Sequence, residues 1–151
     1  MLELRIPPLL LTFIIACVMA GVAYATSPLS VEAIALRWIG SVTVLAGVAV
    51  CLSGVMAFRA ARTTVDPTKP GNATALVRGG IYGWTRNPMY LGFFLVLAGL
   101  ALMLGSWIAL VLAAGFIPYM NRFQIGPEER VLSGLFGAEF DAFRRDVRRW
   151  L

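Results

Sequence analysis

Four long apolar runs follow one another along the chain. The first covers Pro7 to Ala25, and the second covers about Ala33 to Ala60, with no charged residue between Trp38 and Phe58. The third starts at Pro88 and ends near Leu104, and the fourth extends from Trp107 to about Phe123. Because a helix needs roughly 20 apolar residues to cross a bilayer, these runs predict about four transmembrane helices, of which the last two are short.

The polar residues lie between these runs and after them. Two short uncharged turns, Thr26 to Ser30 and Gly105-Ser106, are predicted to join the first helix to the second and the third to the fourth, with Ser30 as a candidate N-cap. Residues 61–87 form the one long polar loop. In the tail after Gly126, apolar side chains recur at three- and four-residue spacing, which predicts an amphipathic helical segment that Gly137 divides and that lies on an anionic membrane face.

Composition restricts the class of protein. Hydrophobic residues make up 59% of the 151 positions, and the mean hydropathy is +0.79. A soluble domain of this length cannot bury so much apolar surface, so we expect an all-α integral membrane protein with a C-terminal amphipathic cytoplasmic helical segment. We expect a single compact unit over 1–151: two anchor helices in 1–60, a loop in 61–87, a helical hairpin in 88–123 and a C-terminal segment in 124–151.

Charge predicts the topology. The net charge is +5, and the basic residues gather beside the apolar runs, as the positive-inside rule requires, so nucleic acid is not expected as a partner. With four crossings, both termini and the 61–87 loop share one side, predicted to be the cytoplasmic side of a bacterial inner membrane. An alternative interpretation takes the first run as a cleaved signal peptide with a cleavage site at Ala23-Tyr24-Ala25.

Histidine is absent from the chain, which removes the commonest general base and metal ligand. The two cysteines, Cys17 and Cys51, lie inside apolar runs and are interpreted as small buried hydrophobic residues. We therefore expect neither a metal site nor a disulfide framework.

Candidate chemistry begins where the polar loop meets the third helix. Arg86 and Asn87 precede Pro88, and Tyr90 and Gly92 follow in the first turns. The exposed N–H groups of a helix N-terminus attract anions such as carboxylates, and glycine permits close approach to the backbone. The structural alternatives are an arginine that reaches to lipid headgroups and an asparagine that caps the helix.

A second cluster lies at the other end of the predicted hairpin. Glu128 and Glu129 follow Pro127, where acids in a first helical turn are ordinary. The predicted topology, however, places them on the same membrane face as Arg86 and Asn87, and Arg122 adds a further possible anion contact. Together these groups suit a small zwitterion bound at the interface.

At these stretches the chain resembles a family. Arg86-Asn87-Pro88-Met89-Tyr90-Leu91-Gly92 is similar to the Arg-His-Pro-x-Tyr-x-Gly motif of the isoprenylcysteine carboxyl methyltransferase and phospholipid methyltransferase superfamily. The hydrophobic hairpin, the Glu128-Glu129 pair, the Phe136–Phe140 stretch and the basic Val147–Arg149 ending follow in the family's order. The resemblance covers about Arg78 to Leu151.

The resemblance implies a membrane-embedded methyltransferase that uses S-adenosylmethionine on a lipophilic or lipid-linked substrate from the bilayer. Carried over by position, it implies that the cofactor contacts are Asn87, Tyr90, Gly92, Glu128 and Glu129. Arg86 matches the arginine placed near the methyl acceptor and is the candidate catalytic residue, with Arg122 a candidate substrate contact. Asn87 replaces the family's histidine, so a mechanism that needs an imidazole at this position is excluded.

Methyl transfer from a sulfonium requires alignment and exclusion of water more than it requires a base. A carboxylate acceptor is already nucleophilic, which favours carboxyl methylation at a site without histidine. Two enzymatic alternatives on the same fold are a phospholipid N-methyltransferase and a small-thiol methyltransferase. The alternative that is not an enzyme is a membrane scaffold protein that has kept the fold without the activity.

Overall fold

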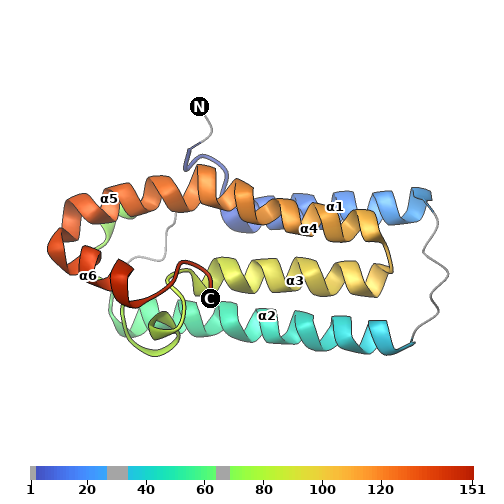
Figure 1. Cartoon of the computed structure of the whole chain (residues 1–151), viewed down its shortest axis with the longest axis horizontal. Coiled ribbons are helices and arrows are strands. Elements are labelled where there is room, and N and C mark those ends of the chain that lie inside the picture. The colour runs from blue at the N-terminus through green and yellow to red at the C-terminus, as the bar shows by residue number, and fades with distance from the viewer. Residues whose placement is uncertain (1–2, 27–33, 64–68) are drawn as a thin grey trace.

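The computed structural model describes residues 3–26, 34–63 and 69–151, and within them every long regular element is a helix. The six main helices, shown in Figure 1, are α1 (Pro8–Thr26), α2 (Ile34–Ala60), α3 (Pro88–Leu104), α4 (Trp107–Met120), α5 (Gly126–Phe136) and α6 (Ala138–Asp146). The predicted all-α fold is confirmed. The predicted N-cap at Ser30 lies outside the described residues.

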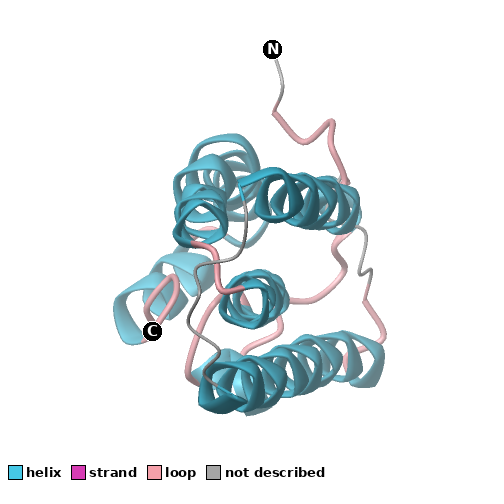
Figure 2. Cartoon of the chain, turned by 90° about the vertical axis from the view of Figure 1, so that its right-hand side faces the viewer, coloured by secondary structure: helices cyan, strands magenta, loops and turns pink. Residues whose placement is uncertain are grey.

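The first four helices run alternately in opposite directions, with α3 between α2 and the α1–α4 pair (Figures 1 and 2). Three helical stretches are long and apolar enough to cross a membrane, namely Pro8–Thr26, Ile34–Ala60 and the continuous Trp107–Phe136, while α3 is a shorter apolar helix of 17 residues. The chain is therefore an integral membrane protein. The predicted Gly105-Ser106 turn is confirmed, because Gly105 ends α3 with φ of 61° and the Ser106 hydroxyl caps α4.

Helices α2 and α3 pack through glycines. Gly40 and Gly47, seven residues apart on α2, face Gly99 and Gly92 on α3, and a Cβ built on any of the four would lie 2.6–2.7 Å from the opposing glycine's carbonyl oxygen. Small residues allow this close approach, which supplies much of the packing between helices in lipid. These glycines of α2 and α3 are therefore packing positions.

The fourth helix continues further than the sequence predicted. In place of an end near Phe123, a π-helical turn over Asn121–Ile125 joins α4 directly to α5. Pro127 has no N–H to donate to the carbonyl four residues earlier, Phe123, and the Leu4 N–H donates to that oxygen instead at 3.0 Å. The N-terminal segment therefore lies at the same end of the bundle as α5.

Gly137, with φ of 49°, separates α5 from α6 as predicted. The apolar face of this amphipathic segment does not lie open to the membrane. Phe140 and Phe143 form a buried cluster with Val77 and Tyr82 of the polar loop. Apolar residues of the loop cover the apolar face of α6, and α6 therefore folds back over the loop at the end of the bundle.

Candidate functional site

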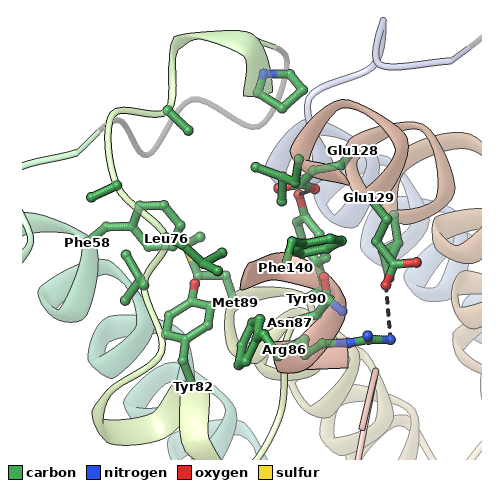
Figure 3. Close-up of a pocket in the computed structure, with 17 residues that line it drawn as sticks. Phe58, Leu76, Tyr82, Arg86, Asn87, Met89, Tyr90, Glu128, Glu129 and Phe140 are labelled. Atoms are coloured by element: carbon green, nitrogen blue, oxygen red, sulfur yellow. Dashed lines mark hydrogen bonds and ion pairs between the residues drawn. The ribbon is translucent and has the colours of Figure 1, made fainter. Parts of the chain in front are cut away.

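A pocket opens at the end of the bundle where α2 ends, α3 begins and α5 and α6 fold back (Figure 3). Its walls are lined by Phe58, Pro70, Ala73, Ala75, Leu76, Val77, Tyr82, Arg86, Asn87, Met89, Tyr90, Ile125, Glu128, Glu129, Leu132, Phe140 and Phe143.

Tyr90 fixes the first acid of the pocket. Its buried hydroxyl donates to Glu128 Oε2 at 2.8 Å and accepts from Gln124 Nε2 at 3.4 Å. Gln124 comes from the π-helical turn, so this irregular turn positions a buried amide toward α3. The chain of contacts holds the Glu128 carboxylate at the pocket wall.

Two arginines fix the second acid. Arg86 Nη2 lies 3.1 Å from Glu129 Oε1, and Arg149 reaches both Glu129 oxygens through Nη2 at 2.5 Å and Nε at 3.3 Å. Bidentate arginine pairs of this kind set the orientation of a carboxylate as well as its charge. The predicted proximity of Arg86 to the Glu128-Glu129 turn is therefore present in the structure.

The Arg86 guanidinium is only partly satisfied. Its side chain is 10% exposed, and neither Nε nor Nη1 has a hydrogen-bond partner among the described residues. Burial lowers the pKa of Arg86, Glu129 acts in the opposite direction, and an arginine remains charged under such conditions. A buried cation with two free N–H groups at a pocket wall favours an anionic ligand.

Asn87 occupies the N-cap position of α3, but its side chain makes no capping bond. Its Nδ2 instead donates to the Arg149 carbonyl at 2.9 Å, and the Thr85 hydroxyl donates to the same oxygen at 3.2 Å. The Arg86 N–H donates to the Arg148 carbonyl at 3.0 Å. These contacts fasten the C-terminal segment across the start of α3.

The structure brings Arg86, Asn87, Tyr90, Glu128 and Glu129 together at one pocket, while their roles as ligand contacts stay predictions. It places two other predicted residues elsewhere. Gly92 faces α2, where its close approach is to Gly47 and Cys51. Arg122, with a side chain 66% exposed, pairs with Glu3 at 2.8 Å on the outside of the π-helical turn.

Sequence reasoning missed three contributors. Arg149 was one of several arginines in a tail interpreted as binding to lipid, and only the Val147–Arg149 match to the family ending set it apart. Tyr82 was not singled out within the polar loop of residues 61–87. The role of Gln124 was not predicted, because a π-helical turn has no sequence signature as clear as that of a helix cap.

These features define a class of protein: a membrane-embedded helical bundle with a pocket at one end, whose lining combines two acids and an arginine with a larger set of apolar residues. The sequence model of the phospholipid methyltransferase family matches residues 35–139. The chain belongs to this family.

Relatives agree with this assignment. The chain is 36% identical over 83 residues to a protein-S-isoprenylcysteine O-methyltransferase of Saccharomyces cerevisiae and 32% identical over 72 residues to that of Schizosaccharomyces pombe. These matches cover 53% and 48% of the chain but only 34% and 30% of the yeast enzymes. An uncharacterized Haemophilus influenzae protein is 41% identical over 63 residues, which is 42% of the chain and 100% of that protein. No solved structure matches.

Proposed function

We propose that the protein transfers a methyl group from S-adenosylmethionine to a carboxylate on a lipophilic or lipid-linked molecule. The observation that carries this proposal is the buried Arg86 guanidinium at the wall of a largely apolar pocket, with two N–H groups that have no partner among the described residues. An anionic group on a hydrophobic molecule satisfies both walls at once. The yeast relatives are named for carboxyl-type O-methylation, which supports the same choice of acceptor.

The residues present fit the proposed cofactor. S-adenosylmethionine carries cationic groups and ribose hydroxyls, for which the carboxylates of Glu128 and Glu129 are suitable partners. The aromatic rings of Phe140 and Phe143 offer an apolar surface for its adenine. We assign Glu128 and Glu129 to the cofactor, with Tyr90 and Asn87 holding the pocket wall behind them.

S-adenosylmethionine supplies an electrophilic methyl group on a sulfonium when bound. The protein would have to align the acceptor with this methyl group. Arg86 would hold the acceptor carboxylate, the Arg149–Glu129 pair would hold Arg86, and the buried walls would exclude water. A carboxylate needs no deprotonation at neutral pH, so no histidine is required.

We infer that the pocket end of the bundle, with both termini, faces the cytoplasm of a bacterial cell, where the soluble cofactor is made. Basic residues are concentrated at this end, as the positive-inside rule requires. The acceptor would enter from the bilayer.

The test uses purified protein, S-adenosylmethionine labelled in its methyl group and a bacterial membrane lipid extract. We expect label in the lipid fraction that mild base releases as methanol. Arg86→Lys should lower the rate at least about tenfold, because lysine lacks the planar donor array, while the exposed Arg145→Lys should leave it unchanged.

A second candidate is methylation of a phospholipid amine, which the description of the matched family favours. In the same assay this activity would leave label in lipid headgroups that resists base. Base-stable label would replace the carboxylate proposal with this one, and no transfer to any lipid would contradict both.

A further inference from the structure

Residues 147–151 follow α6 as a short non-helical segment, which we call the C-terminal strap. The strap lies beside the start of α3, where the C-terminus is marked in Figure 1. Two of its backbone carbonyls accept hydrogen bonds from the residues just before α3. The strap is therefore bonded to the start of α3 along one side.

Trp150 ties the strap to a second part of the bundle. Its indole Nε1–H donates to Asn121 Oδ1 at 3.0 Å, and Asn121 begins the π-helical turn that joins α4 to α5. The half-buried Trp150 ring packs against the main apolar core of the bundle. An indole N–H in such surroundings needs an acceptor, which the Asn121 amide oxygen supplies. Trp150 therefore connects the strap to the turn from which α5 starts.

Trp150 can reach the pocket through the residue beside it. Glu129 of α5 lines the pocket, and the Arg149 side chain contacts both of its carboxylate oxygens, whereas Arg86 contacts only Oε1. The Glu129 side chain is 11% exposed and that of Arg149 is 35% exposed. A long, partly exposed side chain has many rotamers, so a bidentate pair of this kind depends on a backbone that is held in place. The bonds to the start of α3 hold the Arg149 backbone from one side, and Trp150 holds it from the other.

We propose that Trp150 is a positioning residue of the pocket: its bond to Asn121 anchors the strap so that Arg149 fixes the direction of the Glu129 carboxylate. The inference rests on the proposed function, which assigns Glu129 to the cofactor, and adds a residue that acts on cofactor binding through Arg149. Without this bond the strap is held from the α3 side alone, and Arg149 no longer keeps both Glu129 oxygens in place. The cofactor then meets a less ordered carboxylate and binds more weakly.

Calorimetric titration of the detergent-solubilised full chain with S-adenosylhomocysteine tests the inference. Trp150→Phe keeps an aromatic ring on the core and removes the indole N–H. We expect this variant to bind about fivefold more weakly, in line with the loss of one hydrogen bond. In an Arg149→Met protein the same change at Trp150 should alter the affinity less than about twofold, because no guanidinium remains to be positioned.

Trp107→Phe is the matched control. Trp107 is the first residue of α4, at the end of the bundle away from the pocket, and it is 61% exposed. This variant should bind S-adenosylhomocysteine as the wild type does.

Unchanged affinity in Trp150→Phe would overturn the inference and leave the proposed function standing. An equal loss with and without Arg149 would also overturn it, because a general effect of Trp150 on the fold does not depend on the Arg149 side chain. Failure of the wild type to bind S-adenosylhomocysteine at all would instead overturn the proposed function, and this inference with it.

Discussion

At the scale of single residues, Asn87 links the start of α3 to the end of the chain. Its amide donates to the Arg149 carbonyl, and this contact holds the backbone from which the Arg149 side chain reaches Glu129. The related motif has histidine at this position, and a neutral imidazole also has an N–H to donate. We interpret Asn87 as preserving the donor while losing the titratable group.

Two substitutions separate these properties. Asn87→His should keep the contact and leave S-adenosylhomocysteine affinity within about threefold of the wild type. Asn87→Asp places an acceptor against the Arg149 carbonyl, and we expect it to cost about 1–3 kcal/mol of stability. Thermal unfolding in detergent and calorimetric titration measure the two effects. If Asn87→His and Asn87→Asp had the same stability and the same S-adenosylhomocysteine affinity, the hydrogen bond that Asn87 donates would not be what matters at this position.

The sequence predicted that Arg86 and the Glu128-Glu129 turn lie on the same membrane face, because the topology brings the two ends of a hairpin to one side. It did not predict the contact between Arg149 and Glu129. Four arginines occur between Arg144 and Arg149, and nothing local tells which one turns inward. That choice depends on the backbone bonds at Thr85, Arg86 and Asn87, which are long-range contacts.

At the scale of elements, helix ends were predictable where the chain carries a strong terminator. Pro88 starts α3 and Gly105 ends it, both as expected. Pro127 lies at the start of α5 as expected, but the sequence did not show that a π-helical turn joins α4 to α5 without a break. The Leu4 N–H that reaches the Phe123 carbonyl comes from the other end of the chain.

The glycine contacts between α2 and α3 give a prediction at this scale. Gly92→Ala would place a Cβ 2.6 Å from the Gly47 carbonyl oxygen, and only a shift of the two helices relieves that clash. We expect a loss of about 1–3 kcal/mol of stability, measured by unfolding in detergent.

Gly21→Ala is the control, since nothing lies within 4 Å of a Cβ at this position of α1. It should be neutral or slightly stabilising because alanine is the better helix former. A Gly92→Ala protein as stable as the Gly21→Ala protein would show that the close packing of α2 on α3 contributes little.

At the scale of the whole molecule, the fold places a polar pocket at one end of an apolar bundle. The end of α1, the start of α2 and the Gly105-Ser106 turn lie at the other end (Figure 1). Hydropathy and charge together predicted this separation of polar and apolar ends. Four crossings bring both termini and the charged 61–87 loop to the same side of the membrane. The packing of α6 over the loop was not predictable, since an amphipathic helix suits a lipid surface and a protein surface equally well.

Thiol labelling tests the proposed orientation. In a protein with Cys17 and Cys51 replaced by serine, Thr26→Cys should react with a membrane-impermeant maleimide in intact cells. Arg145→Cys, at the exposed surface of α6, should react only after the membrane is broken. The reverse pattern would place the pocket on the outer side and contradict the inferred access to cytoplasmic cofactor.

The central claim is that this pocket binds the methyl-donor cofactor, and calorimetric titration of the detergent-solubilised protein with S-adenosylhomocysteine tests it most directly. We predict one site per chain, at least about tenfold weaker binding in Glu128→Gln, and unchanged binding in Glu139→Gln, a matched change at an exposed acid of α6. Absence of binding, or equal affinity in the two variants, would contradict the claim.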